Sequence, residues 1–253
     1  MNGEAQERFE MGERLEKSGQ DREAVECFRL AAEAGHVSAM VRLGFLAVET
    51  DEAEAERWWR RAAEAGSRSA KGNLGILLSD QGDLEGAEAW YRAAVAEGDL
   101  DAMHNLGLLL VQRGDVKLGA GEFRRAAEAG HVSSMANLGI ALRELGQLSE
   151  SELWFQRGAE AGDGRAMGGL GSLLYALGRR EEADRWWEQG ELAGDAASLF
   201  NLGVRCEHRN EMVRAEEYFE KAAHAGHPRG AARVRAMAAG LRENGVPYMP
   251  GLF

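Results

Sequence analysis

The chain has 253 residues, of which 45% are hydrophobic and 28% charged, so it contains enough apolar material to bury a core, which argues against disorder. Its net charge of −12 argues against nucleic acids and acidic membranes as partners, because binding to phosphates depends on Lys and Arg. The first residues contain no apolar segment of a signal peptide, and no apolar run is long enough to span a membrane.

Two glycine series divide the chain into seven copies of one unit. The first glycine follows Leu or Met and recurs every 32 residues with one step of 31, at Gly12, Gly44, Gly75, Gly107, Gly139, Gly171 and Gly203. The second series has the same period and runs through Gly35, Gly66, Gly98, Gly130, Gly162, Gly194 and Gly226. Two series with one period predict a repeat array over residues 5–230.

Each unit is predicted to form two short helices. In the fourth copy, the first helix has an apolar face at i, i+3, i+4 and i+7, made of Met103, Leu106, Gly107 and Leu110. Gly114 supplies a turn with positive φ, and the second helix ends at Gly130 in a left-handed C-cap. In the seventh copy, Asn210 takes the place of the turn glycine and tolerates the same backbone conformation.

A glycine inside a helix costs about 1 kcal/mol relative to alanine, so seven such glycines indicate close contact between helices. The second helix of each unit carries a large aromatic ring. We interpret these rings as core residues rather than as parts of a ligand cage: Phe28, Trp59, Tyr91, Phe123, Phe155, Trp187 and Phe219.

Stacking of the units predicts an all-α fold, a right-handed α-solenoid of seven helix-turn-helix repeats. We expect one domain over residues 1–244, with a capping helix at 231–244 and an apolar tail at 245–253.

The repeated residues resemble two known families. A Leu-Gly pair followed by Ala, an aromatic pair and Ala-Ala-Glu-x-Gly resembles the Sel-one-like repeat, most closely in residues 87–94. The triplet Asn105-Leu106-Gly107 is similar to the tetratricopeptide repeat. The resemblance covers residues 5–231, but the loop between helices is shorter than is usual in Sel-one-like units. The proline that often ends tetratricopeptide units is absent except near Pro228, so the chain is intermediate between the two families.

The tetratricopeptide resemblance implies a peptide-binding site on the first helices. Two residues before the repeated glycine stand Glu10, Arg42, Asn73, Asn105, Asn137, Gly169 and Asn201. In tetratricopeptide proteins this position lines a concave groove, where asparagine bonds to the backbone of a bound peptide. The resemblance therefore implies that Asn73, Asn105, Asn137 and Asn201 form a ladder, since an amide offers both a donor and an acceptor. Alternatively, these asparagines bond to local backbone or only solvate a helix face.

Further candidate residues on the same face are His104, Leu108, Arg143, Tyr175, Phe200 and His208. Arg42 and Arg143 could pair with carboxylates of a ligand, or with a nearby glutamate of the chain itself. Tyr175 stands near Gly168, Gly169 and Ser172, which suggests a shallow pocket, although the glycines could merely relieve crowding.

These features favour a protein–protein interaction adaptor that binds a peptide segment of a partner in its groove, with no catalytic residues, metal or cofactor. The pair His224 and His227 lacks further ligands, and Cys27 and Cys206 are too far apart in a stacked array for a disulfide, so we expect a cytoplasmic protein. One alternative is a small-ligand sensor or hydrolase-like enzyme with a site near Tyr175 and His208 in the sixth and seventh repeats. Another is self-association through the tail.

Overall fold

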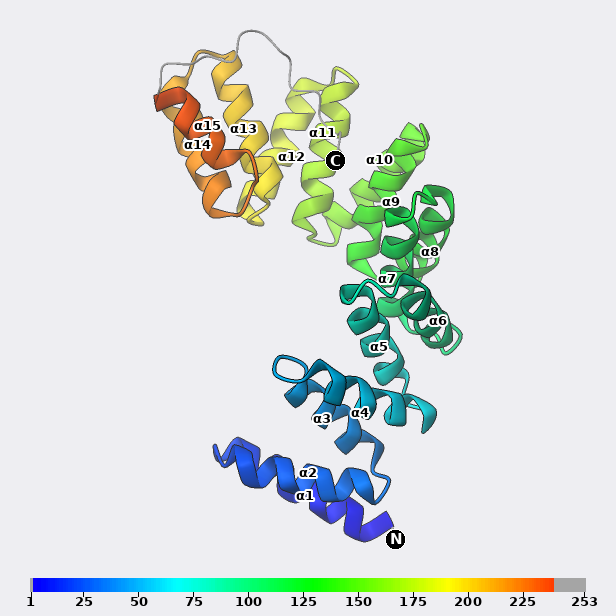
Figure 1. Cartoon of the computed structure of the whole chain (residues 1–253). Coiled ribbons are helices and arrows are strands. Elements are labelled where there is room, and N and C mark those ends of the chain that lie inside the picture. Colours follow the sequence, from blue (N-terminus) through cyan, green and yellow to red (C-terminus); the bar gives the residue numbers. More distant parts are fainter. Residues whose placement is uncertain (1, 239–253) are drawn as a thin grey trace. The chain divides into compact units, whose positions relative to one another are not determined.

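The computed structural model describes residues 2–238, which form fifteen α-helices and no strand (Figure 1). Within each of the two units described below, successive helices pair into hairpins such as α1 with α2 and α9 with α10, so the α-solenoid of helix-turn-helix repeats is confirmed. The chain divides into two compact units, which we call unit 1 (Met1–Gly114) and unit 2 (Asp115–Phe253). Their boundary lies in the turn of the fourth repeat.

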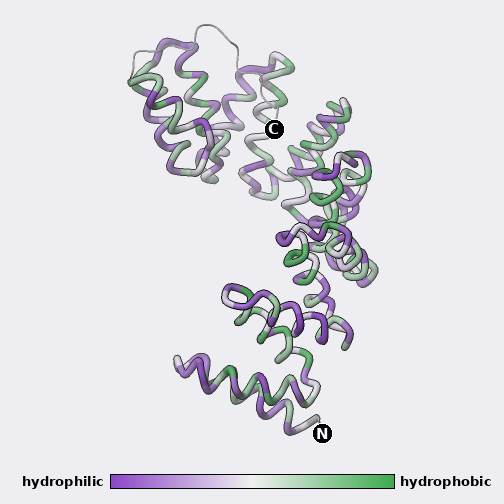
Figure 2. Tube along the Cα trace, in the orientation of Figure 1, coloured by the Kyte–Doolittle hydropathy of each residue, from purple (hydrophilic) through white to green (hydrophobic). Residues whose placement is uncertain are grey.

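Unit 1 contains seven helices: α1 Asn2–Lys17, α2 Asp21–Glu33, α3 Val37–Ala47, α4 Glu52–Glu64, α5 Arg68–Asp80, α6 Leu84–Val95 and α7 Leu100–Gln112. Each of them packs against the next along the chain, and α5 also contacts α7, the first helix of the following repeat. Hydrophilic and hydrophobic residues alternate along every helix (Figure 2), as expected for helices that bury one face.

Unit 2 contains the remaining described helices: α8 Val116–Glu128, α9 Val132–Glu144, α10 Leu148–Glu160, α11 Gly164–Ala176, α12 Arg180–Leu192, α13 Ala196–His208, α14 Met212–His224 and α15 Gly230–Ala238. The last of these packs on α14 and begins the predicted capping helix. Residues 239–244 of that helix and the tail at 245–253 lie outside the described residues. None of the described helices combines the length and apolarity needed to cross a bilayer.

The turns adopt the backbone conformations that the glycine pattern predicts. Gly114 has φ of 90°, and Asn210 has φ of 61° at the equivalent position. At the end of α2, the N–H of Gly35 donates to the carbonyl of Ala32 and the N–H of His36 donates to that of Ala31, each at 3.0 Å. These paired bonds satisfy carbonyls that the helix itself leaves open.

In six of the repeats, the repeated glycine of the first helix lies against the ring of the following second helix. A Cβ added at Gly44 would lie 2.2 Å from Nε1 of Trp59, and one at Gly139 would lie 2.6 Å from Cδ1 of Phe155. The same close approach occurs at Gly12, Gly75, Gly171 and Gly203. The rings themselves are buried, as predicted for core residues, and Phe28, Phe155 and Phe219 have no exposed surface. The absence of a side chain at the glycine therefore sets the distance between the two helices.

We predict that Gly139→Ala destabilises the protein by about 1–3 kcal/mol, because the added methyl group overlaps the buried ring of Phe155. The measurement is the free energy of unfolding in urea. Gly121→Ala is the matched control, since this glycine is exposed on α8 and nothing lies within 4 Å of the added Cβ. The control should be stabilised by about 0.5–1 kcal/mol through helix propensity. Equal effects of both substitutions would show that the ring contact does not require glycine.

Candidate functional site

The glycine that faces the second helix also determines which side of the first helix faces away from it. With about 100° of rotation per residue, the positions two before, one after and five after the glycine lie about 100–160° from its direction. They share one side of the helix, remote from the hairpin partner. We call this side the inner face of the first helix. It contains Arg42, the four predicted asparagines and His208, whereas His104, Arg143, Tyr175 and Phe200 lie closer to the direction of the glycine.

In unit 1 the inner face exposes large apolar side chains at one repeated position. Phe45, Ile76 and Leu108 each follow the repeated glycine directly, and their exposed fractions are 50%, 45% and 44%. We call these three residues the apolar row. At the same position in unit 2 stand Ile140, Ser172 and Val204, none of which is exposed. The apolar row is therefore a property of unit 1.

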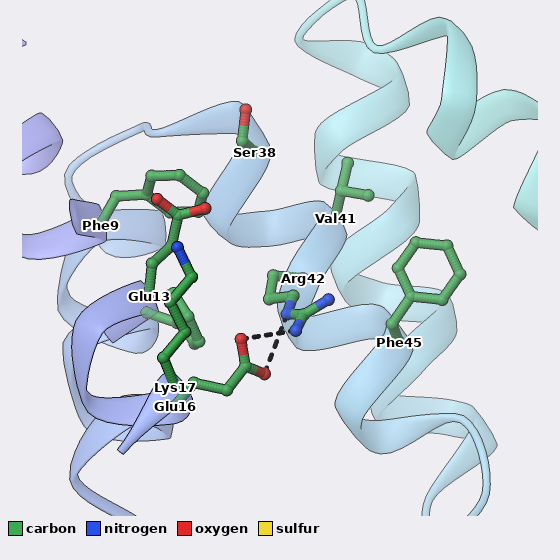
Figure 3. Close-up of a pocket in the computed structure, with 9 residues that line it drawn as sticks. Phe9, Glu13, Glu16, Lys17, Ser38, Val41, Arg42 and Phe45 are labelled. Carbon is green, nitrogen blue, oxygen red and sulfur yellow. Dashed lines mark hydrogen bonds and ion pairs between the residues drawn. The ribbon is translucent and has the colours of Figure 1, made fainter. Parts of the chain in front are cut away.

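A cavity of about 350 Å³ opens beside the first residue of the apolar row, between α1 and α3 (Figure 3). Its apolar lining comes from both helices and from the ring of Phe28, while acidic, basic and hydroxyl groups surround it. The lining residues are Phe9, Glu13, Glu16, Lys17, Phe28, Ser38, Val41, Arg42 and Phe45. This combination of apolar surface and a few charged groups is typical of a site that holds part of a ligand.

Aromatic contacts hold the walls of this cavity in place. The ring of Phe45 packs edge-on against Trp59, with 5.4 Å between the ring centroids. Phe9 stacks on His36 at 4.5 Å and packs at a tilt on Phe28 at 5.6 Å. Rings that are already restrained lose little conformational entropy when a ligand covers them.

Arg42 has a partner within the chain. Its Nε donates to Oε1 of Glu16 at 3.1 Å and an Nη lies 2.5 Å from Oε2, which forms a bidentate ion pair between α3 and α1 (Figure 3). The sequence left open whether Arg42 pairs with a ligand or with a glutamate of the chain, and the structure shows the glutamate. In this pair, Arg42 links two repeats.

The four predicted asparagines lie in two different environments. Asn137 and Asn201 are only 6% and 2% exposed, so the expectation of a ladder of four open amides is wrong for these two. Oδ1 of Asn137 accepts a hydrogen bond from Arg165 at 2.9 Å, and this bond connects α9 to α11. Asn73 and Asn105 are half-buried, and Nδ2 of Asn73 is buried without a hydrogen-bond partner among the described residues. A role of either pair in peptide binding stays a prediction.

Asn201 lies between α11 and α13. Its Nδ2 donates to Oγ of Ser172 at 3.1 Å, and that hydroxyl donates to the carbonyl of Gly168 at 2.8 Å. Because the hydroxyl proton is already used, the orientation of the amide is fixed by this network. Oδ1 of Asn201 is buried and accepts no hydrogen bond from a described residue.

Tyr175 lies in a cluster of arginines on unit 2 rather than beside an open pocket. Its ring packs on Trp187 at 5.6 Å, and the guanidinium carbons of Arg205 and Arg180 lie 5.5 and 6.0 Å from its centroid. Arg205 forms a bidentate pair with Asp184 at 2.8 and 3.1 Å. Arg209, the C-cap residue of α13, also bonds to Asp184, so one carboxylate connects α12 to two arginines at the end of α13.

The two arginines change the pKa of the Asp184 carboxylate. Burial on its own raises the pKa of Asp184, but the hydrogen bond and charge of Arg205, together with the charge of Arg209, lower it below its ordinary value. The same pair raises the pKa of Arg205 through its hydrogen bond to Asp184. Both groups are therefore charged at neutral pH, and the cluster joins neighbouring repeats.

The other predicted residues do not assemble into one site. His104 and Arg143 are half-buried on α7 and α9, and His208 is exposed at the end of α13. Phe200 is buried against His227, with 4.2 Å between the centroids of their stacked rings. Within residues 2–238 no three His, Cys, Asp or Glu side chains are grouped as a metal site would require.

Family comparisons agree with this architecture. The Sel1 repeat matches residues 5–36, 37–67 and 196–227, and the tetratricopeptide repeat matches residues 67–96 and 104–166. The chain is a repeat protein of the Sel1 and tetratricopeptide type. Repeats of these two kinds generally mediate protein–protein interactions, and proteins built from them are typically adaptors rather than enzymes.

Solved repeat proteins share the fold. A Sel1 repeat protein from Oxalobacter formigenes is 26% identical with a TM-score of 0.69, and the match covers 86% of this chain and 99% of that one. Protein c5321 of uropathogenic Escherichia coli, a protective antigen, is 24% identical with a TM-score of 0.71; the match covers 96% of this repeat protein but only 59% of c5321. A tetratricopeptide repeat protein from Parabacteroides merdae is 18% identical, with 93% and 99% covered and a TM-score of 0.64. No curated protein matches the sequence.

We predict that Asp184→Asn lowers the free energy of unfolding at pH 7 by about 1–2 kcal/mol, because Arg205 loses its charged partner while solvent screens part of the effect. The pKa of Asp184 is lowered in the folded state. Its stabilising contribution is therefore complete above the ordinary aspartate pKa of about 3.9 and is lost as the pH falls through the lower folded-state pKa.

Urea unfolding of both proteins at several pH values measures this effect, and the difference between them should shrink as the pH falls from about 5 to 3. Glu211→Gln is the control, because Glu211 pairs with Arg214, whose side chain is 61% exposed. That substitution should change stability little. A difference that is constant with pH would mean that the charge of Asp184 does not stabilise the cluster.

Proposed function

We propose that this repeat protein is an adaptor that binds a peptide segment of a partner protein on the inner face of unit 1. The observation that carries the proposal is the apolar row, Phe45, Ile76 and Leu108, in which half-exposed large side chains occupy one position of three consecutive first helices. Water contact with these side chains is unfavourable, and a bound segment would remove it. Covering half of such a side chain contributes about 1 kcal/mol.

Polar groups beside the apolar row support a peptide as the ligand. Asn73 lies three residues before Ile76, and Asn105 lies three residues before Leu108, each on the same side of its helix. An amide next to an apolar side chain can bond to a peptide backbone while the ligand side chain contacts the row. Nδ2 of Asn73 is buried and lacks a partner within the described chain, so a rotation of the side chain that turns Nδ2 outward would let it donate to a peptide carbonyl.

The alternative of a small-ligand or catalytic site near the sixth and seventh repeats receives less support. The ring of Tyr175 is covered by Trp187 and Arg205, and Asp184 already holds Arg205. These groups form contacts between helices. We therefore assign the cluster a structural role and propose a function in binding, without catalysis.

We further propose that the protein works in the cytoplasm. Cys27 and Cys206 are both free thiols, and Cys206 is buried in the core of unit 2, where burial raises its pKa and keeps the thiol protonated. Free buried thiols are typical of reducing compartments.

We predict that the double substitution Ile76→Ser and Leu108→Ser abolishes the capture of specific partner proteins from a native lysate, as measured by affinity purification and mass spectrometry. The two side chains are half-exposed, so their loss removes apolar contact area for a ligand. A thermal melt of the purified variant checks that the fold is retained.

The control is Leu192→Ser with Val213→Ser, which removes apolar side chains that are 81% and 74% exposed on unit 2. This control should capture the same partners as the unchanged protein. If the folded Ile76→Ser and Leu108→Ser protein keeps its partners, the apolar row is not the binding surface.

A further inference from the structure

Negative charge is concentrated in the part of the chain that carries the apolar row. Unit 1 contains 22 acidic and 13 basic residues, a net charge of −9, whereas the whole chain has a net charge of −12. A charge of this sign attracts cationic ligands and repels anionic ones over a distance of about a Debye length. The composition of unit 1 thus restricts the ligands that approach its inner face.

Two carboxylates accompany the apolar row directly. Asp80 follows Ile76 by four residues and lies one turn beyond it on the same side of α5, and Glu49 follows Phe45 by four residues in the turn directly after α3. Both side chains are exposed, and neither forms an ion pair with any of residues 2–238. Other charges on this inner face are already partly neutralised, as the pair of Arg42 with Glu16 shows.

The positions of these carboxylates are electrostatically unfavourable in the free protein. Asp80 is the last residue of α5, and Glu49 follows the C-cap residue of α3. The C-terminal end of a helix carries a partial negative charge, so an acidic side chain there is destabilised. Burial, and to a lesser extent the charge of Asp80, raises the pKa of Tyr91 to about 12, so the charge of Asp80 lies near the core of the third hairpin. A cation bound at these carboxylates would relieve the repulsion.

The spacing of the apolar row suggests the backbone conformation of a ligand. The first helices α5 and α7, which carry Ile76 and Leu108, pack side by side, and packed helices lie about 8–10 Å apart. A polyproline II segment advances about 3.1 Å per residue with three residues per turn, so every third side chain points the same way after about 9 Å. A β-strand instead repeats a face after about 6.7 Å, which does not match the row.

We propose that the inner face of unit 1 binds a positively charged, extended segment of a partner protein, with an apolar side chain at every third residue and Lys or Arg between them. The apolar side chains contact Phe45, Ile76 and Leu108, and the cations contact Glu49 and Asp80. This inference rests on the proposed function and adds the chemistry and register of the partner segment.

The test is fluorescence anisotropy with three labelled twelve-residue peptides and the full chain. The first peptide repeats Leu-Lys-Lys four times, and the second repeats Leu-Glu-Glu four times. The third has the composition of the first, but its leucines stand at alternate positions. We expect the first peptide to bind at least tenfold more tightly than the second and at least threefold more tightly than the third. Its affinity should fall as the salt concentration rises, because the contacts are partly ionic.

Variants separate specific contact from general attraction to an acidic protein. Ile76→Ser with Leu108→Ser should weaken binding of the first peptide at least tenfold, and Glu49→Gln with Asp80→Asn should weaken it and reduce the salt dependence. The matched control, Glu216→Gln with Glu220→Gln, removes two exposed carboxylates from α14 of unit 2 and should leave the affinity unchanged.

Equal binding of the lysine and glutamate peptides, or unchanged binding by the Ile76→Ser and Leu108→Ser protein, would overturn the inference. Equal binding of the first and third peptides would overturn the register. The peptide test can fail while the proposed function holds. If the Ile76→Ser and Leu108→Ser protein loses its lysate partners but none of the three peptides binds the unchanged protein, the adaptor role stands and the inferred chemistry of the partner segment is wrong.

Discussion

The fold depends on the contact between a glycine, which has no side chain, and a large aromatic ring. In the hairpins within each unit, the first helix carries a glycine against the Phe, Trp or Tyr of the second helix, and a Cβ at Gly44 or Gly139 would overlap that ring. The glycine lowers helix propensity, but the ring it admits becomes fully or nearly fully buried. Burial of the ring offsets the cost of the glycine, and the hairpin closes to a distance that no other residue at that position would allow.

This contact orients the rest of the first helix. Since the glycine must face the ring, the positions directly after it and two before it turn away from the hairpin partner. They then meet either the neighbouring repeat or solvent. Asn137 and Asn201 meet neighbouring helices and become buried, whereas Phe45, Ile76 and Leu108 remain half-exposed. One packing requirement thereby produces both the interface between repeats and the candidate binding surface.

Local regularities made most of the fold predictable. The spacing of the glycines gives the hairpins and turns, and positive φ at Gly114 and Asn210 follows from residue type alone. The site was less predictable, because exposure depends on the neighbouring repeat. The partner of Arg42 lies 26 residues earlier, and Asn201 is covered by a network around Ser172. The apolar row has the period of the glycines and is visible in the sequence, although the sequence pattern indicated only Leu108 as a candidate.

The ring of His36 also has a role that the sequence did not predict. Its Nδ1 accepts a hydrogen bond from the N–H of Ala39 and thereby caps α3.

Because the glycine and the ring that require each other belong to the same hairpin, each repeat carries its own complement. The ring differs among Phe28, Trp59 and Tyr91 in successive copies, and each glycine accommodates the one that follows it. A copy that is duplicated or lost in evolution takes both halves of the contact with it. The array can therefore change its length, and with it the number of side chains it presents to a ligand, without compensating changes in the hairpins that remain.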